Sequence, residues 1–182
     1  MYIKKSLVIL LLFINLILVA QEIRIPDSIF ATYNNKGIIS LFTEKKYYEV
    51  DISNYEISEP IYFEKNKFNI QNYTPIKLDS AYYFINNSGG TVLKLKGNKL
   101  TQIDNSYNHK MQLGSTIFKY NSEIYRYGGY GFFSSRSFIL RYDGITNEWE
   151  SIVIKNSKVP EARYDNSFLL KNDQFAIIGG KN

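Results

Sequence analysis

The sequence predicts an all-β protein, and three observations support that prediction. Aromatic residues make up 16% of the 182 residues, including 16 Tyr and 12 Phe. Tyr, Phe, Ile, Val and Thr favour the pleated surface of a sheet. From Ile23 onward the chain consists of short apolar and aromatic runs separated by turn residues, without an amphipathic helical stretch of useful length. Runs of this kind at this spacing indicate a sandwich, a barrel or a propeller.

Composition excludes several classes of function. The net charge is +5 and the charged residues are scattered along the chain, as on an ordinary solvated surface, so we expect no nucleic-acid partner. The absence of Cys excludes a disulfide framework, a Cys zinc site, a thiol nucleophile and a lipid-modified Cys anchor. The single His, His109, excludes a multi-His metal site within one chain. We therefore expect neither a metal nor a cofactor.

Residues 1–20 are typical of an export signal. Lys4 and Lys5 form a positive start, Leu7–Val19 is apolar except for Asn15, and Ala20 offers a small residue for cleavage. The apolar run is shorter than the roughly 20 residues that a spanning helix needs. We predict a cleaved signal, which places the protein outside the cytoplasm: secreted, periplasmic or on the cell surface. The alternative is an uncleaved anchor, which would be the chain's one contact with a membrane.

Residues 21–182 are expected to form one domain. In its first third the internal register is weak, and this part holds either one four-stranded unit or one and a half. The predicted apolar runs are Phe30–Tyr33, Ile38–Phe42, Tyr47–Ile52, Ile61–Phe63 and Phe68–Ile70.

From Pro75 onward a repeat emerges. Its first unit is most of a four-stranded meander, with strands predicted over Ala81–Ile85, Thr91–Lys96 and Leu100–Ile103. The next unit runs from about residue 109 to 154, with strands over Gly114–Tyr120, Ile124–Tyr127, Phe138–Tyr142 and Trp149–Ile154. A third unit, residues 160–182, holds two strands, Ser167–Leu170 and Phe175–Ile178.

The last two units superpose at an offset of 51 residues. Ser167 then falls on Thr116, and the pair Gly179-Gly180 falls on Gly128-Gly129. A further pair, Gly89-Gly90, lies 39 residues before Gly128-Gly129. Variable spacing with a constant order of strands is how a propeller accommodates loops of different length.

These residues resemble the kelch repeat, whose pattern is a strand ending in Gly-Gly, a loop, a strand ending in Tyr, and a Trp seven residues later. Gly128, Gly129, Tyr142 and Trp149 fit that spacing. Two adjacent glycines permit positive φ and close approach of a neighbouring backbone. A Tyr and a Trp, each a large apolar body with a polar tip, suit packing between adjacent blades. We expect these residues to be architectural.

The resemblance extends to the other units in part. The segment before Gly179-Gly180 looks like the opening of another repeat, with Arg163 in the usual basic place. The unit from Pro75 to Asp104 matches weakly, and Leu100 stands where a Trp would be expected. Residues 109–154 are thus the clearest blade and residues 160–182 a half blade.

The resemblance implies an incomplete propeller. Propellers have about four to eight blades and kelch units run about 50 residues, so residues 21–182 suffice for an open arc of about three to four blades. An open arc exposes unpaired strand edges. We therefore expect a fragment of a longer propeller or one part of an assembly, with self-association through the open edges as a possible consequence.

Kelch propellers are mostly binding platforms, and a minority resemble galactose oxidase or sialic-acid mutarotases. A copper radical oxidase needs a Cys cross-linked to Tyr and several His ligands, and this chain has no Cys and a single His. A mutarotase-like site would use charged side chains at the central face. The candidates for it are Arg126, Arg136, Arg141, Arg163, Asp165 and His109.

The best interaction candidate is the loop Tyr130–Ser137. Tyr130, Phe132, Phe133 and Arg136 place three aromatics and a guanidinium in a segment without a strand pattern, which suits stacking on a sugar face or a protein hot spot. The alternative is that the two Phe residues fold back into the blade or extend its strands. The sequence thus predicts an exported, non-catalytic binding module for a protein or glycan. The alternatives are a carbohydrate-active enzyme and a fragment of a larger sensor or surface protein.

Overall fold

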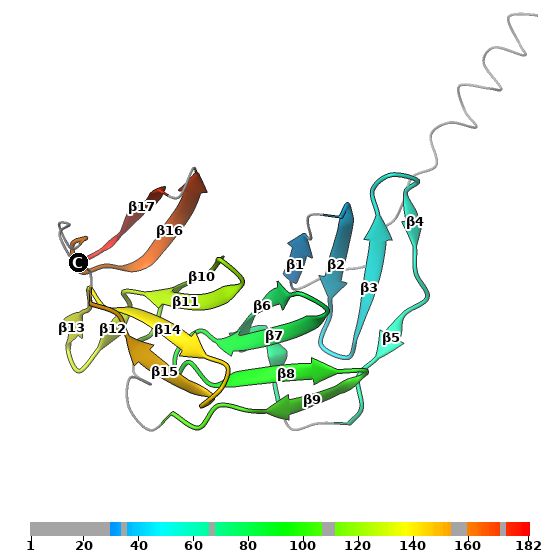
Figure 1. The fold of residues 1–182 in the computed structure, drawn as a ribbon, viewed down its shortest axis with the longest axis horizontal. Coiled ribbons are helices and arrows are strands. Elements are labelled where there is room, and N and C mark those ends of the chain that lie inside the picture. Colours follow the sequence, from blue (N-terminus) through cyan, green and yellow to red (C-terminus); the bar gives the residue numbers. More distant parts are fainter. Residues whose placement is uncertain (1–29, 34–35, 66–67, 107–111, 154–159, 172–173) are drawn as a thin grey trace, which may run out of the picture.

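A computed structural model describes residues 30–33, 36–65, 68–106, 112–153, 160–171 and 174–182. Apart from one short 3-10 helix, the regular elements of these residues are antiparallel strands, and the sheets follow one another in chain order along an open arc (Figure 1). This confirms the predicted all-β class and the four-stranded meanders. The described residues contain no helix of sufficient length and apolarity to span a bilayer. The predicted signal lies outside them.

The first sheet is a single blade. Its strands are β1 (Phe30–Tyr33), β2 (Ile38–Phe42), β3 (Lys46–Asp51), β4 (Glu56–Ile57) and β5 (Ile61–Tyr62). β4 and β5 both pair with β3, at opposite ends of it. They are two halves of one outer strand that is interrupted before Ile61, at Pro60, which has no N–H to donate to a ladder.

The second blade contains β6 (Tyr73–Leu78), β7 (Ala81–Asn86), β8 (Val92–Lys96) and β9 (Lys99–Gln102). The sequence pattern missed β6, which contains Pro75; as an edge strand of this sheet, β6 tolerates a proline. The predicted run Phe68–Ile70 is wrong as a strand. Asn69 instead caps the 3-10 helix η1 (Ile70–Asn72), its side chain accepting a hydrogen bond from the Gln71 amide.

The third blade and a final hairpin complete the arc. The blade consists of β10 (Thr116–Tyr120), β11 (Glu123–Tyr127), β14 (Ile139–Asp143) and β15 (Glu148–Ser151). Between β11 and β14 the chain forms a separate small hairpin, β12 (Tyr130–Gly131) and β13 (Ser134–Ser135). The final hairpin is β16 (Tyr164–Lys171) and β17 (Gln174–Lys181).

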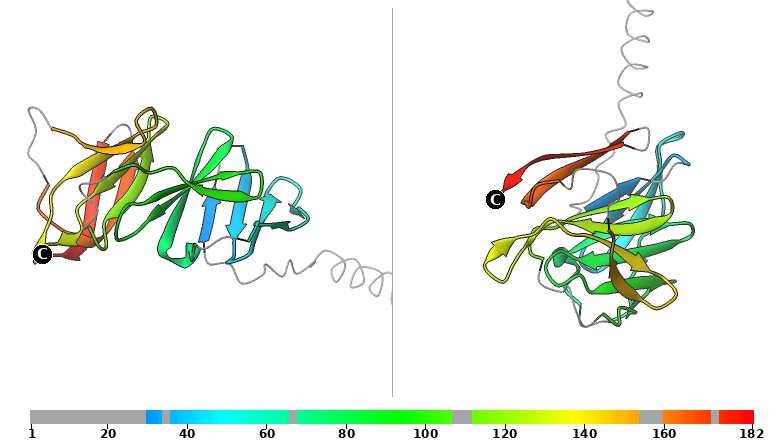
Figure 2. Two further views of the ribbon diagram at one scale, coloured as in Figure 1. Left: turned by 90° about the horizontal axis from the view of Figure 1, so that it is seen from below. Right: turned by 60° about the vertical axis from the view of Figure 1, so that its left-hand side comes forward.

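The blades are arranged as in a propeller. The first strands of successive blades, β1, β6, β10 and β16, lie next to one another on the inner side of the arc, and β9 and β15 lie on its outer side (Figures 1 and 2). The hydrophobic core therefore lies between successive sheets, in three clusters. The first joins blades one and two around Phe42 and Phe84, the second joins blades two and three around Ile85 and Trp149, and the third surrounds Tyr127.

The strand register shows how the repeat is built. In the third blade Tyr142 stands opposite Trp149, and in the second blade Leu95 stands opposite Leu100 at the corresponding positions. All four side chains are buried. Leu100 thus holds the Trp position of its blade, as the sequence predicted.

Candidate functional site

The glycine pair after β11 lets the final hairpin approach the third blade. Gly128 and Gly129 have φ of 69° and 99°, a region that favours glycine. A Cβ at Gly128 would lie 2.2 Å from the carbonyl oxygen of Arg163. The Gly129 amide donates to that same carbonyl at 2.8 Å. Because these glycines have no side chain, the segment that begins the next blade can approach the third blade closely enough to form this hydrogen bond.

The β12–β13 hairpin grows from this junction. The Arg136 amide donates to the Gly129 carbonyl at 2.8 Å, and the Arg163 amide donates to the Arg136 carbonyl at 3.1 Å. Tyr130 contacts Tyr164 with ring centroids 5.4 Å apart. The base of the hairpin is fixed on both sides, while the hairpin itself stands out from the arc (Figures 1 and 2).

Phe132 and Phe133 form the tip of that hairpin. Because Gly131 pairs with Ser134, the two Phe residues are the whole loop. Their φ angles are 51° and 63°, which makes this a type I′ turn, a turn that favours Asn-Gly. The side chains are 73% and 95% exposed. They neither fold back into the blade nor extend its strands.

Arg136 lies beside the aromatic tip. Its guanidinium carbon is 5.7 Å from the ring centroid of Phe132 and 5.8 Å from that of Phe138, within the range of cation–π contacts. Phe138 is itself 44% exposed. Tyr130, Phe132, Phe133 and Arg136 therefore lie on one small hairpin, and we call it the aromatic finger.

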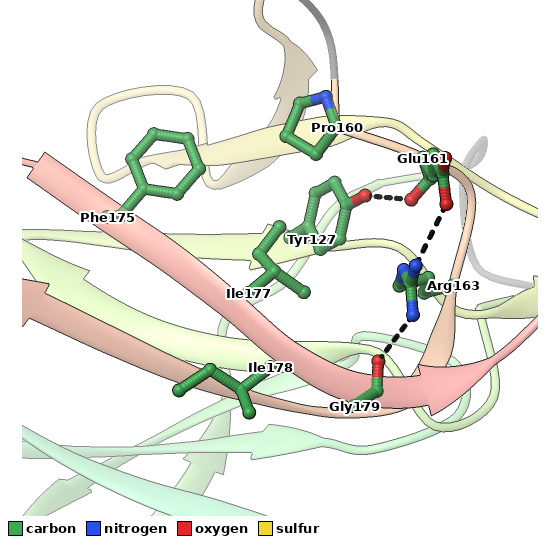
Figure 3. Close-up of a pocket in the computed structure, with 8 residues that line it drawn as sticks. All are labelled: Tyr127, Pro160, Glu161, Arg163, Phe175, Ile177, Ile178 and Gly179. Atoms are coloured by element: carbon green, nitrogen blue, oxygen red, sulfur yellow. Dashed lines mark hydrogen bonds and ion pairs between the residues drawn. The ribbon is translucent and has the colours of Figure 1, made fainter.

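A pocket of about 530 Å³ lies beside the base of this finger, between the third blade and β17 (Figure 3). Tyr127 forms one side, and Phe175 and Ile177 of β17 lie across from it. The Tyr127 hydroxyl donates to the Glu161 carbonyl, and burial raises the pKa of that phenol. Arg163 donates to Glu161 Oε2 at 2.8 Å and to the Gly179 carbonyl at 3.0 Å.

The role of Arg163 repeats one blade earlier. Gln112 is 51 residues before Arg163, and its side-chain Nε2 donates to the carbonyl of Gly128 at 2.8 Å, just as Arg163 donates to the carbonyl of Gly179. In both blades a side chain from the incoming segment binds the first glycine of the pair. The contacts of Arg163 therefore have a structural role, as those of Gln112 have in the third blade.

Arg126 is fully buried at the boundary between blades two and three. It donates to the Ser115 hydroxyl and to the carbonyls of Ser88 and Gln112 at 3.0–3.3 Å, and its guanidinium lies 5.4 Å from the Trp149 ring centroid. Burial lowers its pKa to about 10, against the opposing effect of Asp104. The Arg126 side chain therefore has a structural role at the boundary between these two blades.

The other charged candidates have different partners. Arg141 forms ion pairs with Glu123 at 3.3 Å and Glu150 at 2.9 Å, and Asp165 pairs with Lys181 at 3.3 Å. Each of these pairs is part-exposed, so each contributes little to stability. His109 lies outside the described residues. Within the described part of the chain no three His, Asp or Glu side chains group closely enough to hold a metal ion.

The two architectural aromatics lie where adjacent blades meet. Tyr142 and Trp149 are buried, with ring centroids 5.2 Å apart. The Trp149 indole donates to the carbonyl of Gly90 in the preceding blade at 2.7 Å. Residues that sequence reasoning missed are Tyr127, Glu161 and Gln112; the offset of 51 that aligns the two glycine pairs also aligns Gln112 with Arg163 and would have identified it.

Comparison with known proteins gives the fold. No protein-family model matches the chain, and no curated protein matches it either. Among solved structures, YjhT, a β-propeller, superposes with a TM-score of 0.61 at 13% sequence identity. The match covers 87% of this chain and 59% of YjhT. The chain therefore shares a β-propeller fold with YjhT and spans somewhat more than half of its length.

Proposed function

We propose that this chain is an exported binding module with kelch-type blades, and that it recognises a protein partner through the aromatic finger. The observation that carries the proposal is the pair Phe132 and Phe133, which present two largely exposed rings on a turn that disfavours them. Strained backbone at exposed positions persists where the surrounding structure over-determines it, and such positions cluster at functional sites.

The energetics of the turn support a binding role. A bulky side chain at positive φ costs about 1–2 kcal/mol relative to the ordinary region, and Asn-Gly would remove most of that cost. Phenylalanine side chains this exposed gain little from burial in the free protein. Both costs are offset when the rings enter a pocket on a partner, because aromatic side chains that fill pockets dominate interface energies.

The shape of the finger favours protein over glycan. Sites for small molecules are concave, whereas this hairpin protrudes from the arc (Figure 2) and carries its aromatic rings at the tip. Arg136 beside Phe132 adds a cation that a protein partner can pair with a carboxylate at the rim. A protruding aromatic tip with a basic neighbour fits an apolar groove with an acidic border.

The test compares the parent chain with a variant carrying Phe132→Asn and Phe133→Gly, and with Ile145→Ser as the matched control. Ile145 is 91% exposed in another turn of the same blade. All three are immobilised and exposed to proteins of the producing cell's exterior and, in parallel, to a glycan array. Retention of a protein by the parent and by Ile145→Ser, with loss in the finger variant, is expected.

Equal retention by all three chains would show that the finger is not the binding surface. Loss of a glycan signal in the finger variant alone would change the partner class from protein to glycan. Export is tested separately, by mass spectrometry of the N-terminus of the mature protein.

A further inference from the structure

β17 stands in the last hairpin where β11 stands in the third blade. Thr116 pairs with Tyr127, and 51 residues later Ser167 pairs with Ile178 in the same register. β11 is bonded on its other side to β14, whereas the described residues provide no strand for the other side of β17. A row of backbone N–H and C=O groups there forms a template for an added strand.

The side chains of β17 show the same difference. Ile124 and Tyr127 of β11 are each 1% exposed. Their counterparts Phe175 and Ile178 on β17 are 42% and 55% exposed. Positions that the fold buries in one blade are thus open in the next. Part of the cover in the third blade comes from β14 and β15, which have no counterpart beside β17 in the described chain.

The pocket beside Tyr127 corresponds to a filled site one boundary earlier. Between blades two and three, Trp149 packs in a cluster with Ile85 and Ile124. In strand register, Tyr127 takes the place of Ile85, and Phe175 takes the place of Ile124. Both Tyr127 and Phe175 line the pocket (Figure 3). In strand register, the cavity therefore corresponds to the position that Trp149 fills at the earlier boundary.

The walls of the pocket are already held in place. Arg163 bridges Glu161 on one side and the Gly179 carbonyl of β17 on the other (Figure 3), and the Tyr127 hydroxyl is bonded to the Glu161 backbone. An occupant would therefore enter a formed site and would not need to order it first, which lowers the cost of binding.

We propose that the open edge of β17 and the pocket beside Tyr127 form a docking site for a two-stranded antiparallel ribbon built like β14–β15, with a Tyr and a Trp seven residues apart. The first strand of the ribbon pairs with β17, placing its Tyr opposite Phe175 as Tyr142 stands opposite Ile124. Its Trp enters the pocket beside Tyr127.

The test uses the full chain and a backbone-cyclised peptide with the sequence of residues 138–153, since an isolated linear hairpin is marginally stable. Binding is measured by fluorescence anisotropy, and hydrogen exchange of residues 174–181 locates it. The matched control peptide carries Ala in place of the residues that correspond to Tyr142 and Trp149. It is expected to bind on the order of tenfold more weakly.

On the protein side, Phe175→Ser is compared with Leu169→Ser. Both residues are exposed apolar residues of the final hairpin, but Phe175 lines the pocket and Leu169 lies outside it. Phe175→Ser is expected to weaken the peptide by about tenfold, and Leu169→Ser to leave it unchanged.

The proposal would be overturned by equal affinity for both peptides, by equal effects of the two substitutions, or by exchange protection away from β17. Protection of β17 in the peptide-free chain that rises with protein concentration would also overturn it, since a second copy would then be the occupant. Denaturant midpoints of both variants, measured alongside, show whether any loss of binding comes from unfolding.

Discussion

The indole nitrogen of Trp149 donates a hydrogen bond to the carbonyl oxygen of Gly90, 2.7 Å away in the preceding blade. The two residues are 59 positions apart, and the contact is buried. Around it lie the Arg126 guanidinium and the Tyr142 ring. A glycine of one repeat thus receives the tryptophan of the next, which gives the kelch-like pattern of a Gly-Gly pair and a distant Trp a direct physical reason.

Replacing Trp149 by Ala is expected to lower the free energy of unfolding by about 3–5 kcal/mol, the usual cost of truncating a buried Trp. Trp149→Phe keeps a ring but loses the bond to Gly90, leaving a buried carbonyl unpaired, and it should cost about 1–3 kcal/mol. Urea denaturation gives both values. Ile145→Ala, in an exposed turn of the same blade, serves as the control and should change little. Coinciding midpoints for Trp149→Ala and the parent would place the indole on the surface.

Gly90 and Gly97 form a matched pair for a second prediction. Both have positive φ, 74° and 61°, so an Ala at either costs about 1–2 kcal/mol of backbone strain. A Cβ at Gly90 would also lie 1.8 Å from Arg126 Nη1, whereas a Cβ at Gly97 would meet nothing within 4 Å. Gly90→Ala should therefore cost about 1–3 kcal/mol more than Gly97→Ala, as overpacking does. Equal losses in urea denaturation would mean that the arginine moves aside freely.

The third blade was the part of the fold that the sequence predicted best. Its β10–β11 and β14–β15 pairs lie close to the predicted ranges because apolar residues, turns and the glycine pair recur together there. The offset of 51 also holds in the strand register. Leu100 could be assigned to the Trp position because its blade keeps the same order of strands.

Other features of the fold depend on contacts between residues far apart in the chain, which the local sequence pattern does not show. β6 escaped notice because a proline interrupts its pattern, and a proline is acceptable only once the strand is known to be an edge. The β12–β13 hairpin lacks the Asn-Gly signal of its turn type. Arg126 occupies the register position that Phe84 occupies in the second blade. A charged guanidinium can be buried at that position because carbonyl groups of distant loops accept its hydrogen bonds.

Export gives a third prediction. Lys4, Lys5 and the apolar run Leu7–Val19 should direct the chain through a secretory route, with cleavage after Ala20. Mass spectrometry of protein recovered from the producing cell should then find Gln21 as the first residue. Recovery of intact Met1 on membrane-bound protein would favour an uncleaved anchor.

Alkaline pH gives a fourth prediction, through Tyr125. Burial, with the hydrogen bond to the Glu123 carboxylate, raises the pKa of its phenol from 10.0 to about 12. The folded state therefore favours the neutral phenol. The resulting stability is fully present below pH 10, where the unfolded phenol is also neutral, and is lost as the pH rises through about 12.

Tyr125→Phe removes this linkage. The free energy of unfolding of the parent should fall more steeply than that of the variant between about pH 10 and about pH 12, when both are measured by urea denaturation. Burial also raises the pKa values of other phenols, which contribute to a fall that both proteins share: Tyr47, Tyr73, Tyr82, Tyr127 and Tyr142. Parallel curves would show that Tyr125 titrates normally.

The last prediction concerns the aromatic finger, where stability and binding should oppose each other. Phe132 and Phe133 occupy both left-handed positions of a two-residue turn, and each costs about 1–2 kcal/mol there. The variant Phe132→Asn, Phe133→Gly supplies the residues that the turn prefers and removes two largely exposed rings that bury little apolar surface.

Its free energy of unfolding should rise by about 1–3 kcal/mol relative to the parent, measured as a higher urea midpoint with an unchanged slope. Phe132→Ser and Phe133→Ser keep the unfavourable φ and isolate the contribution of the rings, so each should stay within about 0.5 kcal/mol of the parent. A drop in stability for the Asn-Gly variant would mean that the rings support the blade through Arg136 and Phe138. A rise in stability with loss of partner retention would show that the free protein holds a less stable turn because the two rings are needed for binding.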